Sequence, residues 1–312
     1  MTSGHAKLVA VVGCGLIGES WSALMTAYGH NVLVWDPSQK ALDGFTERVG
    51  VARAQVRQSQ RGLEVREGTI EIVANLADAV RRVEWVQENA PESVPLKMEL
   101  YDRIEAATAP TTVIASSTSS LTWSELSSNL RHKDRFITAH PFNPPHLMPL
   151  VEIYAASPEM AAQANLFYQA LGRETVLLTR DAVGHIANRL ASALWREAVN
   201  IVAEGIADVA SVDAALVHGP GLRWSVLGAH MAYHLGGGTG GMEHYLRRLG
   251  PSQERRWATL GNPQLTPDVC ARLVEGVRAE AGGRSIRELE AQRDAALIRV
   301  LAARRGSEDA AA

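Results

Sequence analysis

The sequence has little cysteine, no strong excess of charge and no long apolar run. Only two of its 312 residues are cysteine, Cys14 and Cys270, which excludes a disulfide framework. The formal net charge of −3 at pH 7 gives no electrostatic footprint for nucleic acid or for an anionic membrane. No apolar run reaches membrane-spanning length, and no signal-peptide pattern precedes the first predicted strand. These absences favour a cytoplasmic protein with neither nucleic acid nor membrane as a partner.

Two further patterns are missing. The glycine-rich stretch 236–241 lacks both the preceding strand and the Lys-Ser/Thr ending of a phosphate-binding P-loop, so it is interpreted as a flexible turn. No internal repeat is visible. The length of the chain predicts two domains and is ample for a large core.

A glycine-rich turn follows the first apolar run. Residues 8–12 predict a buried strand, and residues 19–27 predict a helix. Between them, Gly13 permits a tight turn, Gly15 lets the backbone approach a pyrophosphate, and Gly18 lets the helix lie close to its strand. The free N–H groups at the start of that helix would bind the pyrophosphate. A glycine turn in an unrelated α/β protein is the alternative.

The second apolar run supports a dinucleotide site. Residues 31–35 end in Asp36, about 20 residues beyond the glycines, where a carboxylate accepts hydrogen bonds from the adenosine ribose. The same charge would repel a 2′-phosphate, so NAD is favoured over NADP. Polar residues at the end of the strand predicted at 83–86 face the same crevice. The predicted cofactor contacts are Gly13, Gly15, Leu16, Ile17, Gly18, Asp36, Glu88 and Lys97.

The rest of the chain separates into two kinds of pattern. Strands are predicted at 83–86, 112–115, 136–139 and 150–153, with a helix at 97–107 and a charged, solvated helical excursion over 44–76. The α/β alternation stops near Asp181, and helical spacing follows, with breaks at 205–211 and 218–221 and a capping box of Ser285 with Glu288. Residues 306–312 are expected to fray. The predicted class is α/β: a Rossmann-type dinucleotide-binding domain, residues 1–183, followed by an all-helical C-terminal domain, residues 184–312.

Polar residues gather after two strands of the first domain. Five hydroxyl residues, 116–120, follow one strand, where they either cap the next helix or line a polar crevice. His140 ends the next strand, and a proline-rich turn leads to a short strand that carries Glu152. A lone histidine at a strand end is usually structural. A His–Glu pair beside a nucleotide crevice favours catalysis instead.

These motifs together resemble the 3-hydroxyacyl-CoA dehydrogenase superfamily over nearly the whole chain. The most specific stretches are Ala-Ser-Ser-Thr-Ser-Ser-Leu at 115–121, His-Pro-Phe-Asn-Pro at 140–144 and Gly-His-Ile-Ala-Asn-Arg-Leu at 184–190. The resemblance implies that His140 is the catalytic base, that Glu152 is its partner, and that Ser119 and Asn188 hydrogen-bond the reacting oxygen. His185 departs from the family, which often has Phe there.

Four stretches of the second half, 194–198, 219–224, 233–237 and 283–289, resemble L-carnitine dehydrogenases. This implies NAD-dependent oxidation of the 3-hydroxyl of a free acid, L-carnitine to 3-dehydrocarnitine. The alternatives are L-gulonate 3-dehydrogenase, short-chain 3-hydroxyacyl-CoA dehydrogenase, and an NADH-binding structural or sensor protein. Asn188 stands where the carnitine enzymes often have Asp. The resemblance also implies a homodimer formed through the C-terminal domain.

Aromatic and basic residues of the second half suggest a substrate site. On a helix, Trp195 shares a face with Asn188. Trp195, Trp224 and Tyr233 would offer π-faces to a trimethylammonium group, each contact worth about 0.5–2 kcal/mol, although each is also a plausible core residue. Arg223 is a candidate for the substrate carboxylate, with an exposed salt bridge as the alternative. The predicted substrate contacts are Ser119, Phe142, Asn188, Trp195, Arg223, Trp224 and Tyr233.

Overall fold

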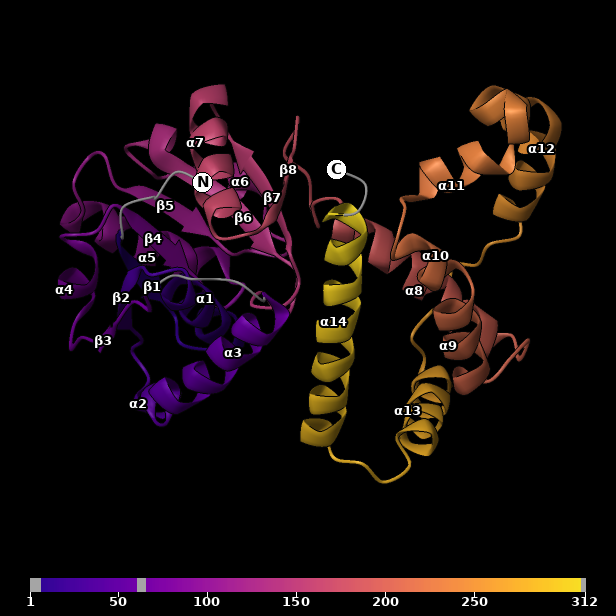
Figure 1. Cartoon of the computed structure of the whole chain (residues 1–312), viewed down its shortest axis with the longest axis horizontal. Coiled ribbons are helices and arrows are strands. Elements are labelled where there is room, and N and C mark those ends of the chain that lie inside the picture. Colours follow the sequence, from indigo (N-terminus) through magenta and orange to yellow (C-terminus); the bar gives the residue numbers. More distant parts are fainter. Residues whose placement is uncertain (1–6, 61–65, 310–312) are drawn as a thin grey trace. The chain divides into compact units, whose positions relative to one another are not determined.

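A computed structural model describes residues 7–60 and 66–309 of the chain. The chain divides into two compact units, one of residues 1–189 with 296–305 and one of residues 190–295 with 306–312. The first unit contains a twisted sheet with helices, and the second consists of helices, as Figure 1 shows. This is the predicted class, an α/β dinucleotide-binding fold followed by an all-helical part.

The sheet of the first unit has eight strands in the order β3-β2-β1-β4-β5-β6-β7-β8. Its strands are β1 (Leu8–Val12), β2 (Asn31–Trp35), β3 (Ile70–Ile72), β4 (Trp85–Glu88), β5 (Val113–Ser116), β6 (Phe136–Pro141), β7 (Leu150–Ala155) and β8 (Glu174–Leu177). The first six are parallel, in the order 3-2-1-4-5-6 of dinucleotide-binding folds. Of the strand pairs in the described residues, only β6–β7 is antiparallel.

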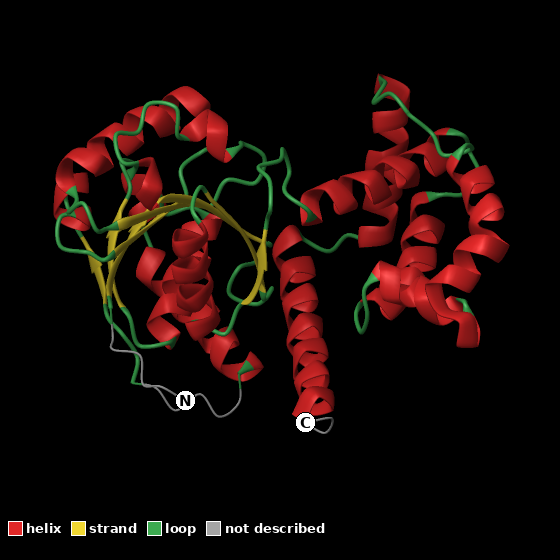
Figure 2. Cartoon of the chain, turned by 90° about the horizontal axis from the view of Figure 1, so that it is seen from above, coloured by secondary structure: helices red, strands yellow, loops and turns green. Residues whose placement is uncertain are grey.

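Alternation along the strands divides the core between the two faces of the sheet. Val9 and Val11 belong to one buried cluster, whereas Ala10 and Val12 belong to another. Successive side chains of a strand point to opposite faces, so a strand buried on both faces is apolar throughout, as 8–12 is. Helices cover both faces (Figure 2).

The helices that precede residue 184 correct one prediction. They are α1 (Leu16–Ala27), α2 (Gln39–Leu42), α3 (Phe45–Ser59), α4 (Leu76–Val80), α5 (Val94–Ala107), α6 (Trp123–Leu126) and α7 (Pro158–Ala170), with a 3₁₀ turn at Lys133–Arg135. The expected helical excursion over 44–76 is wrong in its second half, because the helix ends at Ser59 and β3 joins the edge of the sheet; residues 61–65 lie outside the description. It is also wrong in character, since Phe45, Val49 and Val56 of α3 are fully buried.

The helical part contains α8 (Ala187–Ala203), α9 (Val209–His218), α10 (Pro220–Trp224), α11 (Ala229–Gly236), α12 (Gly241–Trp257), α13 (Pro267–Ala281) and α14 (Ile286–Asp309). Both predicted helix breaks are confirmed. The stretch 236–241 contains a 3₁₀ turn, Gly238–Gly240, between two helices. Ser285 and Glu288 form the predicted reciprocal cap. The expected fraying of residues 306–312 is wrong for 306–309, because α14 continues to Asp309; residues 310–312 lie outside the description.

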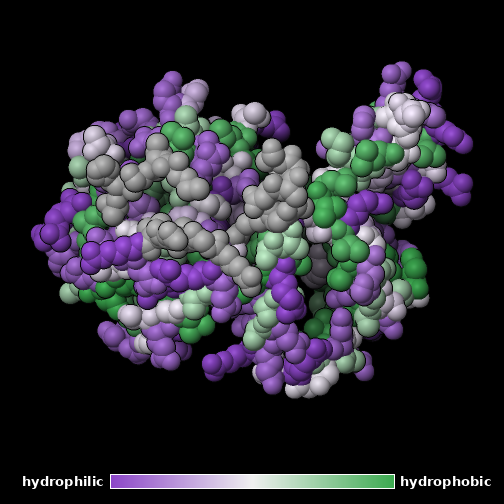
Figure 3. Space-filling view, viewed as in Figure 1, coloured by the Kyte–Doolittle hydropathy of each residue, from purple (hydrophilic) through white to green (hydrophobic). Residues whose placement is uncertain are grey.

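Many apolar side chains of the helical unit reach its surface. Leu190, Leu222, Val226 and Trp257 are each at least 60% exposed in the single chain, and Figure 3 shows hydrophobic residues spread over this unit. Exposed apolar side chains in this number make the helical unit a candidate for an interaction surface. No helix within the described ranges is long and apolar enough to cross a membrane.

Candidate active site

The antiparallel β6–β7 pair places His140 directly opposite Glu152. His140 Nδ1 lies 2.9 Å from Glu152 Oε2, and both side chains are buried. His140 was expected at the carboxyl end of its strand, and β6 continues one residue further, to Pro141. Cross-strand register therefore joins the two residues that the sequence predicted as a pair.

The start of α8 binds the other oxygen of Glu152. The backbone N–H groups of Ile186 and Ala187 donate to Glu152 Oε1 at 2.8 and 2.9 Å. A left-handed turn directs them there, with φ of 74° at Gly184 and 51° at His185. Free N–H groups in the first turn of a helix favour a bound carboxylate.

These contacts keep Glu152 ionised. Burial alone would raise the pKa of the Glu152 carboxyl, but hydrogen bonds from His140, Ala187 and Ile186 outweigh it, and the net pKa lies below the ordinary value. An ionised carboxylate accepts the Nδ1–H of His140 and so leaves Nε2 as the acceptor nitrogen. His140 is therefore held in the tautomer that a general base requires.

A cavity of about 340 Å³, here called the His140 cavity, opens beside this pair. It is lined by Ile17, Asn89, Ala90, Pro91, Glu92, Ser117, Ser119, His140, Pro141, Phe142, Asn143 and Asn188. The structure thus brings together five of the predicted site residues from four separate stretches of sequence: Ile17, Ser119, His140, Phe142 and Asn188.

Asn188 and Ser119 differ in how their side chains are occupied. Asn188 Nδ2 donates to the Ser119 carbonyl oxygen at 3.1 Å and lies 3.4 Å from His140 Nε2. The Ser119 hydroxyl instead donates to Glu92 Oε1 at 2.8 Å. One N–H of Asn188 is therefore anchored on Ser119 while the other faces the base.

Glu92 was missed by sequence reasoning. Its carboxylate accepts hydrogen bonds from the backbone N–H of Ser119 and Ser120 and from the Thr118 hydroxyl. Burial would raise the pKa of Glu92, but the bonds from Ser119 dominate and the net pKa is lowered. The available signal was an acid a few residues past the end of β4, at the edge where parallel strands bind ligands.

His185 also contributes to the site. Its ring centroid lies 4.9 Å from that of His140, and the residue is 3% exposed. Its Nδ1 is buried without a hydrogen-bond partner among the described atoms. Burial, followed by the charge of His140, lowers the pKa of His185. A second, neutral imidazole therefore lies against the base where the sequence indicated only a departure from the family.

A second cavity of about 640 Å³, here called the Gly13 cavity, lies along the glycine loop. Its lining includes Gly13, Gly15, Trp35 and Asp36, and Arg103 lies over the Trp35 ring at 5.6 Å. Asp36 Oδ2 accepts from the backbone N–H of Cys14, and Oδ1 from that of Ser38. The carboxylate is thus fixed at the end of β2, as a ribose ligand requires.

The glycines have the geometry that a dinucleotide needs. Gly13 has a φ of 94°, and a Cβ at Gly18 would lie 1.9 Å from the Gly13 carbonyl oxygen. At Gly15 a Cβ would meet nothing within 4 Å, which leaves open space where a pyrophosphate approaches the backbone. The residues present therefore fit NAD, with the N-terminus of α1 at the phosphates.

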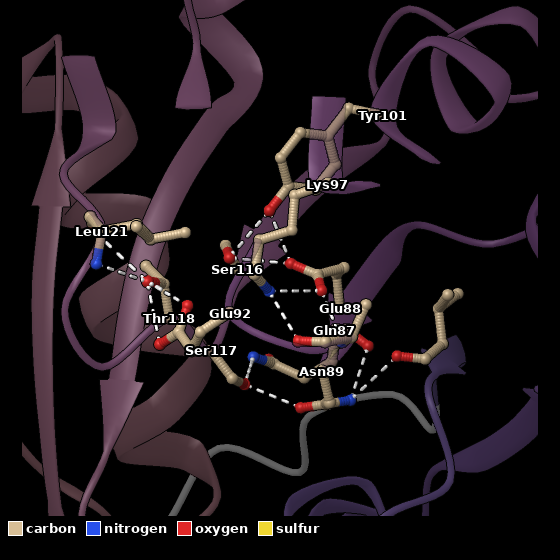
Figure 4. A network of polar contacts seen from close by, with 12 residues as sticks. Gln87, Glu88, Asn89, Glu92, Lys97, Tyr101, Ser116, Ser117, Thr118 and Leu121 are labelled. Carbon is tan, nitrogen blue, oxygen red and sulfur yellow. Dashed lines mark hydrogen bonds and ion pairs between the residues drawn. The ribbon is translucent and has the colours of Figure 1, made fainter. Parts of the chain in front are cut away.

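Of the other predicted cofactor contacts, one is exposed and two are buried away from both cavities. Leu16 is 55% exposed at the start of α1, whereas Glu88 and Lys97 are 0% and 1% exposed. Neither Glu88 nor Lys97 is among the described residues that line the two cavities. As Figure 4 shows, they bond to each other in a network with Tyr101 and Ser116.

The remaining predicted substrate contacts belong to the helical unit. Trp195, Trp224 and Tyr233 are 56%, 39% and 37% exposed, so the core alternative does not describe them. Tyr233 lies against the Tyr245 ring, with centroids 5.0 Å apart. Arg223 is exposed and forms no ion pair with any side chain that the structure describes.

Comparison with known proteins identifies the family. Residues 8–182 match the model of the 3-hydroxyacyl-CoA dehydrogenase NAD binding domain, and residues 184–286 match that of the C-terminal domain. An L-carnitine dehydrogenase of Nocardiopsis dassonvillei is 41% identical over 94% of this chain and 90% of its own length. One of Pseudomonas sp is 38% identical over 96% and 94%.

Among solved structures, an NAD⁺-dependent 5-formyl-3-hydroxy-2-methylpyridine 4-carboxylic acid 5-dehydrogenase has a TM-score of 0.82. It covers 95% of this chain and 97% of its own at 24% identity, which shows the shared fold. The two family models and the full-length identities lead to one conclusion: the chain belongs to the 3-hydroxyacyl-CoA dehydrogenase family of NAD-dependent oxidoreductases.

Proposed function

We propose that the protein oxidises the 3-hydroxyl of L-carnitine to 3-dehydrocarnitine with NAD. The observation that carries this proposal is the buried His140–Glu152 pair, which opens on a cavity with Asn188 and Ser119 beside the glycine loop. The choice of carnitine is supported by the full-length relatives that bear that name.

His140 is the proposed base. NAD, when bound, supplies the hydride acceptor. Nε2 of His140 accepts the proton of the substrate hydroxyl, and Glu152 stabilises the imidazolium that forms. Asn188, anchored on the Ser119 carbonyl, donates its second N–H to the reacting oxygen as charge develops there. Ser119 completes the polar wall of the His140 cavity.

The cofactor contacts of the proposal are Gly13, Gly15, Leu16, Ile17, Gly18 and Asp36, with Glu88 and Lys97 behind them. Phe142, in the His140 cavity, is a proposed substrate contact. The exposed faces of Trp195, Trp224 and Tyr233 are assigned to the trimethylammonium group. A quaternary cation binds to such faces through the ring quadrupole. Arg223 is assigned to the carboxylate, because its guanidinium is exposed and its planar fork matches a carboxylate.

The assembly and the compartment belong to the same proposal. We propose a homodimer formed through the helical domain, whose exposed apolar residues, including Leu222 and Val226, favour burial against a second copy. We place the enzyme in the cytoplasm, since it has two cysteines and neither of them is disulfide-bonded.

The decisive experiment is NADH formation at alkaline pH with five substrates: L-carnitine, D-carnitine, L-gulonate, L-3-hydroxybutyrate and 3-hydroxybutyryl-CoA. Turnover with L-carnitine alone is expected. Turnover only with a substrate that lacks the quaternary ammonium group, such as L-3-hydroxybutyrate or L-gulonate, would keep the mechanism but reject the cation subsite. NADH binding without turnover of any substrate would favour a sensor. The His140→Gln variant serves as the control, and it should bind NADH but turn over several orders of magnitude more slowly.

A further inference from the structure

The segment 178–186 joins β8 to α8 and contains neither helix nor strand. Its residues are exposed or half-buried, except for His185, which is buried. A stretch with few buried contacts and few backbone hydrogen bonds opens easily. Yet this segment ends in the left-handed turn that directs two N–H groups to Glu152. Its position must therefore be fixed by individual side-chain contacts.

Asp181 ties the middle of this segment to α6. Its Oδ1 accepts from the backbone N–H of Trp123 at 3.0 Å, and its Oδ2 accepts from the backbone N–H of Ser124 at 2.8 Å. The Ser124 hydroxyl also donates to Oδ2 at 2.8 Å. Hydrogen bonds to a carboxylate are shorter and stronger than those between neutral groups. One side chain thus binds a helix that begins 58 residues earlier in the sequence.

The first turn of α6 also has a local cap. The Thr122 hydroxyl accepts from the backbone N–H of Glu125, and the Glu125 carboxylate accepts from the backbone N–H of Thr122. Ser124 is exposed, so water would serve its N–H as an acceptor if Asp181 were absent. The contact with Asp181 therefore matters more to the segment 178–186 than to α6.

α6 is a fixed support for this contact, because Trp123 binds it to the sheet. The Trp123 indole N–H donates to the Phe136 carbonyl oxygen at the start of β6, at 2.9 Å. The Trp123 ring meets the Tyr154 ring of β7 edge-on, with centroids 5.9 Å apart. These are the two strands that carry the catalytic pair. Asp181 is therefore anchored, through α6, on the strands that hold the base and its partner.

The two stretches that Asp181 joins meet again at the reacting site. Ser119 lies just before α6, and Asn188 lies in the first turn of α8. Asn188 Nδ2 donates to the Ser119 carbonyl oxygen at 3.1 Å and lies 3.4 Å from His140 Nε2. A displacement of the connecting segment along α6 would therefore move the Asn188 amide away from both groups. It would also move the two N–H donors of Glu152 away from that carboxylate.

We propose that Asp181 is a positioning residue for the oxidation of the substrate. It holds the segment 178–186 on α6, so that the first turn of α8 presents its N–H groups to Glu152 and the Asn188 amide to the reacting oxygen. Within the part of the chain that the structure describes, the lining of the His140 and Gly13 cavities does not include Asp181. The inference rests on the proposed function, because it acts through residues assigned there.

The test compares Asp181→Ala with Asp208→Ala in the full chain. Asp208 is a matched control, because its carboxylate also accepts a backbone N–H at the start of a helix, that of Ser211 in α9 at 2.8 Å. For each variant, the kcat with L-carnitine, the Kd of NADH by fluorescence and the melting temperature are measured. Asn188→Ala and the double variant Asp181→Ala/Asn188→Ala complete a double-mutant cycle, which measures the coupling between the two residues.

We expect Asp181→Ala to lower kcat about 10-fold, because a small misplacement of reacting groups is costly, while the Kd of NADH stays within about 2-fold. Asp208→Ala should lower the melting temperature by a similar amount and leave kcat unchanged. In the Asn188→Ala background, Asp181→Ala should lower kcat less than about 3-fold, since the placement of Asn188 no longer matters there. Asp181→Asn keeps one acceptor oxygen, and it replaces the alanine variant if that protein does not fold.

A folded Asp181 variant with the kcat of wild type would overturn the inference. Equal losses in the wild-type and Asn188→Ala backgrounds would overturn it as well, because Asp181 would then act independently of Asn188. So would weaker NADH binding with an unchanged kcat, which would place the effect at the cofactor. Absence of turnover by the wild type with all five substrates would instead reject the proposed function, and this inference with it.

Discussion

Replacing Glu152 with glutamine tests the central electrostatic claim. The substitution keeps the size of the side chain but removes the charge 2.9 Å from His140 Nδ1. For charge centres about 4 Å apart, an effective dielectric constant near 20 gives roughly 4 kcal/mol of stabilisation for the imidazolium. The glutamine oxygen can still accept the Nδ1–H, which restores about 1 kcal/mol. The remaining ~3 kcal/mol corresponds to a loss of about 10²-fold in kcat.

A second cost comes from the start of α8. If the amide oxygen of the glutamine faces His140, its NH₂ group faces the N–H groups of Ile186 and Ala187, whose only acceptor among the described side chains is Oε1. We therefore expect kcat to fall by about 10²- to 10³-fold, because the imidazole is misplaced in addition to losing the stabilising charge. The Kd of NADH should not change.

The assay is NADH formation at saturating L-carnitine and NAD, with circular dichroism and NADH fluorescence to show that the variant is folded. Glu159→Gln, an exposed acid in α7, controls for the loss of charge. A folded Glu152→Gln enzyme with kcat within 5-fold of wild type would refute the role of Glu152.

Three further predictions concern other parts of the first unit. Gly18→Ala should abolish NADH binding and lower the melting temperature, because its Cβ would overlap the Gly13 carbonyl; Gly50→Ala, where a Cβ meets nothing, should leave both unchanged or raise stability by about 0.5–1 kcal/mol. Asp36→Asn should weaken NADH and improve NADPH, so a constant ratio of the two Kd values would argue against the ribose contact. Because the pKa of His185 is lowered in the folded state, the unfolded chain binds a proton on this imidazole at a higher pH than the folded chain does. The free energy of unfolding should therefore fall as pH decreases through 6.5. Urea titrations of His185→Phe between pH 8 and 6 should show a smaller decrease than wild type.

Local patterns predicted the parts of the site that depend on local backbone. The glycine loop, Asp36 and the start of the helical half all follow from residue type and spacing along one strand–turn–helix unit. The approach of His140 to Glu152 followed from a proline-rich turn between two short apolar runs. In each case the interacting residues are close in sequence or lie at strand ends, where parallel sheets bring distant segments to one edge.

Residues whose role depends on burial were beyond the reach of those patterns. Lys97 was predicted as a cofactor contact, and only the packing of α5 on the sheet shows that its ammonium faces Glu88. The strand Ile70–Ile72 has only three residues, Ile-Glu-Ile, which is too short a run to predict a strand beside the charged helix before it. The sequence does not indicate the left-handed φ of His185, because residues other than glycine rarely adopt that conformation.

The turn at Gly184 and His185 couples the two halves of the catalytic arrangement. The first turn of α8 presents two N–H groups to Glu152 and, one residue later, the side chain of Asn188 to the space beside His140 Nε2. The orientation of the base and the placement of the donor to the reacting oxygen therefore share one structural origin. A displacement of this helical turn would move both together. The strained backbone at His185 therefore fixes both the tautomer of His140 and the position of Asn188.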